Sequence, residues 1–185
     1  MLGHGVSVSM YMFHGGTNFW YMNGANTAGG YRPQPTSYDY DAPLGEWGNC
    51  YPKYYAFREV IQKHLPHGTV LPEVPADNPT TTFATIELKE SAPLQAAFHQ
   101  TTESENVLSM EDLGVDFGYI HYQTTINKAG KQKLIIQDLR DYAVILVDGK
   151  QVASLDRRYN QNNVMLDIQK APATLEILVE NTGRV

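Results

Sequence analysis

The sequence predicts a chain of two kinds of structure, an α/β part followed by an all-β part. Its first third contains one strand-like run, a long Gly- and Tyr-rich loop and one stretch with helical apolar spacing. The remainder contains short strand-like runs separated by turn residues, a spacing typical of an antiparallel β-sandwich or jelly roll. With 185 residues and 42% hydrophobic residues, the chain is able to build an ordinary globular core.

The first predicted element is a buried strand over residues 6–13. This run, VSVSMYMF, is rich in strand-forming residues and leads directly into His14-Gly15-Gly16, a turn signal. A long loop over residues 14–48 follows. Loops of this length are uncommon unless they are functional, so we expect the loop to carry a site. The aromatic residues crowded in and just after this loop are Trp20, Tyr21, Tyr31, Tyr38, Tyr40, Trp47, Tyr51, Tyr54 and Tyr55.

A helix is predicted after the loop. Apolar side chains recur at helical spacing in Tyr54, Phe57, Ile61 and Leu65, Pro52 suits the first turn, and Pro66 ends the pattern. Strand, loop and helix together form one βα unit. One such unit cannot cover both faces of a parallel strand, so neighbouring units are required.

The rest of the chain is predicted to be a linker and a β domain. Prolines without periodicity indicate a linker over residues 66–82, between a first domain at 1–65 and a β domain at 83–185. Asp148-Gly149 is a strong signal for a type I′ hairpin. The predicted strands are residues 83–88, 118–126, 133–137, 143–147, 151–155, 164–168 and 175–179.

Composition argues against several classes of function. A net charge of −6 without basic runs disfavours nucleic acid and anionic membrane surfaces as partners, and no stretch of about 18 apolar residues indicates a membrane span. The single cysteine, Cys50, excludes multi-cysteine metal sites. The glycines lack the motifs of nucleotide-binding loops, so no cofactor is expected. No metal site is expected from the scattered histidines, which are His4, His14, His64, His67, His99 and His121.

Asp39 and Asp41 are the carboxylates to weigh as a glycosidase pair. Glycoside hydrolysis uses two carboxylates about 5 Å apart for retention, or further apart for inversion. Residues two apart in one extended segment cannot easily flank opposite faces of a sugar. We therefore expect both to hydrogen-bond loop backbone.

Several motifs resemble family 35 β-galactosidases over nearly the whole chain. Those that match the end of the catalytic barrel are YMFHGGTNF at 11–19, NGAN at 23–26, QPTSYDYDAPL at 34–44 and KYYAFR at 53–58. Those that match the first β domain after the barrel are DFGYIHY at 116–122, VDGK at 147–150 and LVENTGRV at 178–185.

The resemblance implies that residues 6–13 are the last strand of a (β/α)₈ TIM barrel, followed by a jelly-roll-like domain. The parent would be a retaining exo-β-galactosidase that removes terminal β-galactosyl residues without metal or cofactor. Tyr11 and Tyr40 match tyrosines that line the galactose pocket beside the nucleophile. The family's nucleophile and acid/base glutamates lie on earlier strands, so the chain alone is expected to be inactive. Its β domain is expected to be truncated, because Val185 precedes the family's usual Asn-Tyr-Gly.

Some residues depart from the family pattern. Trp20 stands where a glycine is common, and Gly45-Glu46-Trp47 replaces a frequent Ser-Glu-Ala, so the pocket rim and leaving-group preference are not carried over. Glu46 and Glu59 stand in the wrong motifs to replace the catalytic glutamates. Two alternatives stay open from the residues alone: a non-catalytic carbohydrate-binding module, and a structural β-sandwich whose tyrosines only pack.

Overall fold

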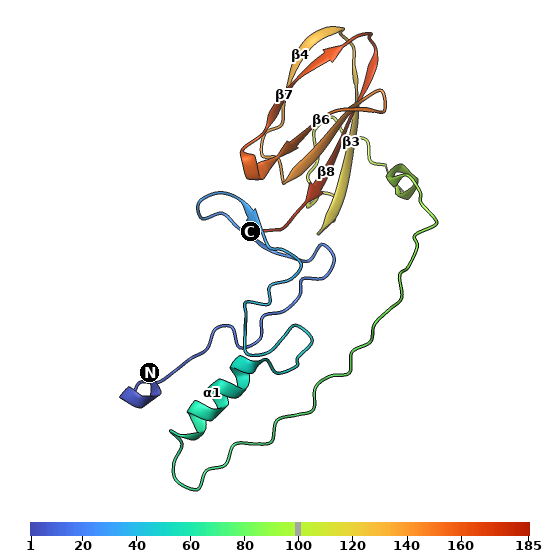
Figure 1. The fold of residues 1–185 in the computed structure, drawn as a ribbon. Helices are drawn as coiled ribbons and strands as arrows, with labels where there is room; N and C mark the ends of the chain where they lie inside the picture. The colour runs from blue at the N-terminus through green and yellow to red at the C-terminus, as the bar shows by residue number, and fades with distance from the viewer. Residues whose placement is uncertain (99–100) are drawn as a thin grey trace. The chain divides into compact units, whose positions relative to one another are not determined.

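The computed structural model describes residues 1–98 and 101–185, and Figure 1 shows their fold. Most regular structure consists of strands in antiparallel sheets, with one α-helix, α1 (Pro52–Gln62). The chain divides into two compact units, each built from two segments. Residues 1–16 and 39–108 form one, called here the helical unit, and residues 17–38 and 109–185 form the other, the β unit. His99 lies outside the described residues.

Two of the sheets in the β unit share one core. A four-stranded sheet has the order β3-β8-β5-β6, and a two-stranded sheet pairs β4 with β7. All the pairings are antiparallel. The strands are β3 (Gly118–Ile126), β4 (Gly130–Ile135), β5 (Tyr142–Val147), β6 (Lys150–Asp156), β7 (Asn163–Ile168) and β8 (Ala173–Asn181). Every strand predicted beyond residue 110 is therefore present.

The core of the β unit lies between these sheets. Ile145 of β5 and Ile168 of β7 are the largest fully buried side chains, at 0% and 2% exposure. They come from different sheets and belong to one apolar cluster, which defines a sandwich. Burying such a side chain contributes about 1.5 to 3 kcal/mol, so this cluster explains why the β unit folds compactly.

The hairpin between β5 and β6 has the predicted turn. Asp148 has φ 50° and Gly149 has φ 74°, the two positive angles that a type I′ turn requires. Val147 pairs with Lys150 across the turn. The Asp148 Oδ1 also accepts a 2.8 Å hydrogen bond from the Thr174 N–H, which ties the turn to β8.

In the helical unit, α1 starts close to the predicted position. Pro52 occupies its first turn, where the missing N–H costs no helical hydrogen bond. Glu59 and Lys63 form an exposed ion pair at 2.6 Å, one turn apart. No residue of α1 is buried, and Phe57 and Val60 are 40% and 46% exposed. Its apolar stripe is therefore only partly covered within the described residues, where Tyr54 and Ile61 are half-buried. The short helices are η1 (Leu2–His4), η2 (Leu94–Ala97) and η3 (Arg157–Tyr159).

Two predicted strands are absent. Residues 6–13 form no strand, and Val6, Val8 and Met10 are 37% to 47% exposed. Residues 83–88 also form no strand, and Leu88 is 93% exposed. Both runs have strand-forming residues, but a strand is stable only when a neighbour satisfies its N–H and C=O groups. Within the described residues, neither run pairs with another strand, and in the first run the Phe13 carbonyl accepts a hydrogen bond from Leu44.

Residues 17–38 pack with the β unit although they precede the helix in sequence. This segment contains the two-stranded pair β1 (Ala25–Asn26) and β2 (Arg32–Pro33). The Ala25 N–H donates to the Arg184 carbonyl at 2.7 Å, beside a Gly24–Arg184 bridge. The predicted functional loop is thus divided, with its middle on the β unit and its ends in the helical unit.

Candidate functional site

Tyr11 and Tyr40 lie together in the helical unit. Their ring centroids are 6.4 Å apart with an interplanar angle of 80°, an edge-to-face contact. Tyr11 is 87% exposed and Tyr40 is 63% exposed. The structure therefore brings these two distant positions into one solvent-facing pair, with rings able to meet a ligand.

The backbone around Tyr40 is held in an unusual conformation. Tyr40 and Asp41 have φ 62° and 49°, in the left-handed region that costs residues with a Cβ about 1 to 2 kcal/mol each. The Asp39 Oδ1 accepts a 3.0 Å hydrogen bond from the Asp41 N–H. This Asx turn offsets part of the cost and fixes the direction in which Tyr40 projects.

Side chains near the start of α1 also form hydrogen bonds to the turn at Asp39–Asp41. Lys53 Nζ donates to the Asp41 Oδ2 at 2.5 Å and also to the Asp41 carbonyl. The Tyr51 hydroxyl donates to the Asp39 Oδ2 at 3.2 Å. Desolvation, followed by this hydrogen bond and the nearby Asp39 charge, raises the pKa of Tyr51. Asp39 and Asp41 therefore form turn contacts, the structural use expected of them.

Tyr11 is positioned through the residues that follow it. The Leu44 N–H donates to the Phe13 carbonyl at 3.1 Å, and His14 forms a parallel bridge with Leu44. The Phe13 ring contacts Tyr54 of α1, with centroids 6.1 Å apart. These contacts link the segment just after Tyr11 to the segment that follows Tyr40. The two tyrosines are thereby brought together.

A buried polar cluster in the β unit anchors residues 17–38. Tyr31 is 7% exposed, and its hydroxyl lies 2.8 Å from both Asp141 Oδ2 and Thr182 Oγ1 and 2.7 Å from the Gly183 carbonyl. Arg157 bonds the Asp141 Oδ1 at 2.7 Å and covers the Tyr31 ring at 4.2 Å. Desolvation is the main cause that raises the pKa of Tyr31 to about 12. No local pattern indicates this contact, since Tyr31 is one of several tyrosines in the loop.

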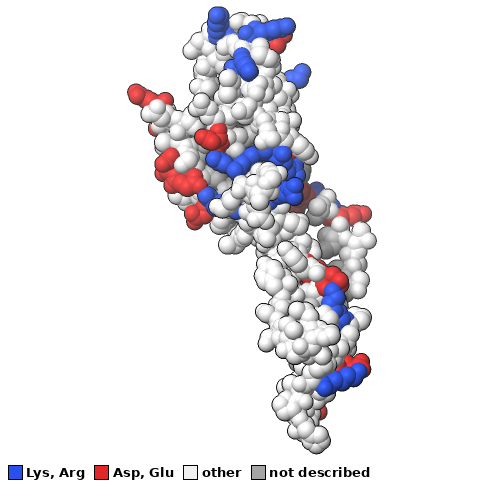
Figure 2. Space-filling view, turned by 90° about the vertical axis from the view of Figure 1, so that its left-hand side faces the viewer, with Lys and Arg blue, Asp and Glu red and all other residues white. Residues whose placement is uncertain are grey.

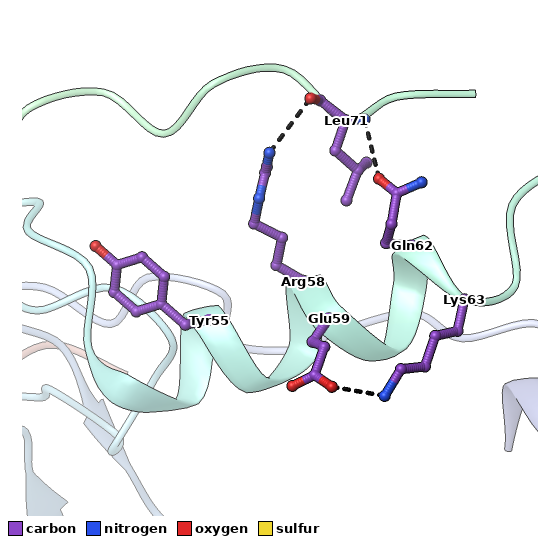
Figure 3. Close-up of a pocket in the computed structure, with 6 residues that line it drawn as sticks. All are labelled: Tyr55, Arg58, Glu59, Gln62, Lys63 and Leu71. Atoms are coloured by element: carbon purple, nitrogen blue, oxygen red, sulfur yellow. Dashed lines mark hydrogen bonds and ion pairs between the residues drawn. The ribbon is translucent and has the colours of Figure 1, made fainter. Parts of the chain in front are cut away.

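Two hollows lie away from the tyrosine pair. One, of about 340 Å³, lies on α1, where Arg58 and Gln62 bond the backbone of the following chain at Leu71 (Figure 3). Another, of about 310 Å³, lies in the β unit beside Asp156 and Arg158. Asp156 is already paired with Arg158 at 2.6 Å, and that hydrogen bond lowers its pKa. Neither hollow contains a pair of unengaged carboxylates suited to glycoside hydrolysis.

On the face shown in Figure 2, charged side chains form small groups, several with acidic and basic residues side by side, between larger uncharged areas. Among residues 1–98 and 101–185, no group of three or more His, Cys, Asp or Glu side chains could hold a metal ion. Within the same ranges, no helix has the length and apolar character to cross a membrane.

Comparison with known proteins identifies both parts of the chain. Residues 1–64 match the family model for glycosyl hydrolases family 35, and residues 107–185 match that for the first all-beta domain of beta-galactosidase. All of the chain aligns with the beta-galactosidases of Xanthomonas manihotis (41% identity), Mus musculus (42%) and Homo sapiens (38%). It spans only 31%, 29% and 28% of their lengths. The chain belongs to glycosyl hydrolase family 35, of whose β-galactosidases it corresponds to a segment.

Proposed function

We propose that this chain is part of a retaining exo-β-galactosidase, comprising the end of its TIM barrel and the start of its first β domain. In this proposal, Tyr11 and Tyr40 line the pocket for a terminal β-galactosyl residue. The observation that carries it is their contact at 6.4 Å on an exposed surface, in a chain whose relatives are named beta-galactosidases. No metal or cofactor is required for this reaction.

The reaction would proceed in two displacements. A carboxylate attacks the anomeric carbon while a carboxylic acid gives its proton to the leaving oxygen, and water then hydrolyses the glycosyl-enzyme intermediate. The phenols of Tyr11 and Tyr40 would donate hydrogen bonds to the nucleophile or to sugar hydroxyls. Such donors act most strongly where charge changes in the transition state.

The two catalytic glutamates are proposed to lie on earlier barrel strands, outside residues 1–185. Glutamates within the chain are poorly suited to replace them. Glu59 is paired with Lys63 on the surface of α1, and the hydrogen bond from Lys63 lowers its pKa, so it is a poor general acid at neutral pH. Asp39 and Asp41 are occupied in the turn that carries Tyr40.

A turnover assay tests this proposal. The 185-residue chain and a longer protein that adds the preceding barrel strands would be assayed on a chromogenic β-galactoside. We expect turnover from the longer protein only, because the chain alone lacks the covalent route. Circular dichroism of the 185-residue chain would verify that its strands are folded during the assay.

Two results would contradict the proposal. One is turnover by the purified 185-residue chain that disappears when Asp39 or Asp41 is changed to Asn. The other is the absence of turnover from the longer, folded protein. If that protein bound galactosides without hydrolysing them, the non-catalytic carbohydrate-binding module would be the better description.

A further inference from the structure

One end of the four-stranded sheet in the β unit carries a row of tyrosines and carboxylates. Tyr119 of β3 lies opposite Glu180 of β8. Tyr142 of β5 lies between Glu180 on one side and Asp156 of β6 on the other. Side chains of directly opposite residues lie on the same face of a sheet. Ala143, the next residue of β5, is fully buried in the core, so the row lies on the face opposite to the core.

The hollow beside Asp156 and Arg158 lies over part of this row. Its volume of about 310 Å³ is close to the lower end of the range for small-molecule sites, about 300 to 1,000 Å³. The residues that line it are Pro33, Tyr142, Asp156, Arg158, Glu180 and Thr182. Pro33 comes from residues 17–38, which the buried Tyr31 hydroxyl fixes to Thr182 at 2.8 Å. The walls of the hollow are therefore held in place by the fold of the β unit.

Arg158 brings hydrogen-bond donors to the hollow. Its Nε and Nη2 groups bond the Asp156 Oδ2 at 2.9 and 2.6 Å, and its Cζ lies 5.6 Å from the centroid of the Tyr159 ring. These contacts orient the guanidinium and neutralise the Asp156 charge. They do not use the Nη1 group, which carries two further N–H donors. Because the side chain is 51% exposed, a ligand can reach that group.

Glu180 brings a hydrogen-bond acceptor to the hollow. The carboxylate is half-buried, and within residues 1–98 and 101–185 it has no ion-pair partner. Desolvation raises its pKa, and the hydrogen bond from Tyr119 offsets only part of that rise. A carboxylate that has lost water without gaining a positive partner is stabilised by additional hydroxyl donors.

We propose that this hollow binds a neutral hexopyranose ring, with its hydroxyls bonded to Glu180 and to the Arg158 Nη1 group and its C–H face against Tyr142. A sugar hydroxyl both donates and accepts hydrogen bonds, so a ring with several hydroxyls suits an acceptor and a donor in one hollow. Tyr142 and Pro33 supply the apolar wall that such a ring requires. Every lining residue belongs to the β unit, and the site does not depend on the proposed function above.

A titration of the 185-residue chain with methyl β-galactoside tests this site. Two-dimensional amide NMR would follow the chemical shifts of Tyr142, Glu180 and Thr182. We expect these shifts to change with one dissociation constant, on the order of 1 mM for a single sugar ring. Unchanged shifts at all three amides, at sugar concentrations in the tens of millimolar, would overturn the proposal.

Two variants test the polar contacts. Glu180→Gln keeps the shape of the side chain and removes its charge, and it should weaken binding roughly fivefold. Arg158→Gln removes the guanidinium donors and should weaken binding by a similar factor. Arg140→Gln is the matched control, because Arg140 is an exposed arginine of the β unit that pairs with Asp138, and it should bind as the unchanged chain does.

The dissociation constants decide between the outcomes. Equal values in the unchanged chain and in Glu180→Gln would overturn the proposal. If Arg158→Gln lost the dispersed amide spectrum of a folded chain, Glu180→Gln would decide alone, since its substitution leaves the Asp156–Arg158 pair intact. A parallel titration with methylammonium chloride tests the carboxylates as a cation site. Shift changes at the same three amides with methylammonium and none with the sugar would also overturn the assignment.

Discussion

At the scale of single residues, Tyr40 combines an exposed phenol with a fixed backbone. Its left-handed φ is maintained by the Asp39 side chain within the turn and by Lys53 from α1. A donor that is oriented before substrate arrives needs no reorganisation during the reaction. Tyr11 has a single described ring contact, to Tyr40, and is more exposed, so its phenol is held less firmly.

Tyr40→Phe in the longer protein should therefore lower kcat more than it changes KM. Loss of one hydrogen-bond donor to a changing charge costs on the order of 2 to 4 kcal/mol of transition-state stabilisation. Tyr11→Phe should have a smaller effect of the same kind. Steady-state kinetics would measure both, with Tyr159→Phe as a control on an exposed tyrosine of the β unit. Near-normal kinetics for both would show that these tyrosines only pack.

Gly183 lies at a position in the β unit where a side chain would not fit. It has φ 149°, and an added Cβ would lie 2.6 Å from the Gly24 carbonyl oxygen and 2.8 Å from the Asn23 Nδ2. We expect Gly183→Ala to destabilise the chain by about 1 to 3 kcal/mol, from backbone strain and overpacking. Hydrogen exchange should accelerate at Ala25, whose N–H bonds Arg184.

Gly130→Ala is the matched control for this variant. Gly130 also has a positive φ, of 100°, but an added Cβ meets nothing within 4 Å. It should lose stability through strain alone and leave exchange at Ala25 unchanged. Equal acceleration at Ala25 in both variants would show that contact with Gly24 has no special role.

At the scale of elements, the segment at residues 17–38 depends on one buried hydroxyl. The Tyr31 phenol joins the segment to Asp141 and to the end of β8. Tyr31→Phe removes these bonds and leaves Asp141 paired with Arg157. Loss of a buried hydrogen bond costs about 1 to 3 kcal/mol, so local opening should become roughly 5- to 150-fold more frequent.

Hydrogen exchange followed by mass spectrometry would measure this effect. Amides of residues 17–38 should exchange faster in Tyr31→Phe, while those of β3, β5 and β8 should change little. Tyr159→Phe, at an exposed tyrosine, should leave both groups unchanged. Uniform acceleration across the strands would instead show that Tyr31 supports the whole sandwich.

The raised pKa of Tyr31 predicts a pH dependence for the same element. An unfolded tyrosine titrates near 10 and Tyr31 near 12, so the folded state retains the proton more strongly. This contribution is fully present below pH 10 and is lost as the pH rises through 12. It amounts to roughly 2 to 3 kcal/mol. Urea titrations between pH 9 and 12 should show a steeper loss of stability in the unchanged chain than in Tyr31→Phe.

Strands could be predicted from the sequence where the strands that pair with them lie in the same chain. The strands of the sandwich were predicted because alternation and turn residues such as Asp148-Gly149 agree with an available neighbour. Residues 6–13 and 83–88 are also rich in strand-forming residues but do not pair. The residue pattern of a run does not reveal whether a partner strand is present. The Tyr31–Asp141 contact joins positions 110 residues apart, which no local signal reports.

At the scale of the whole molecule, the two units are interleaved along the chain. The β unit takes residues 17–38 from within the helical unit, and the chain then passes through residues 39–108 before entering the sandwich. The later part of this segment is exposed to solvent. Val70, Phe83 and Leu88 are 84%, 78% and 93% exposed. Proteases should therefore cut there first, whereas the strands beyond residue 118 should persist.

Limited proteolysis should then leave two peptides that remain associated. A cut near residue 80 separates residues 17–38 from residues 109–185 covalently, but the bonds of Tyr31 and Ala25 still join them. Native mass spectrometry should detect the pair, and a denaturing gel should show two pieces. Gly183→Ala and Tyr31→Phe should promote their separation, while Gly130→Ala should not. Immediate dissociation in the unchanged chain would show that residues 17–38 are held only by their covalent ends. Preferential survival of residues 1–65 without the sandwich would overturn both the division at the linker and the proposal of a barrel end.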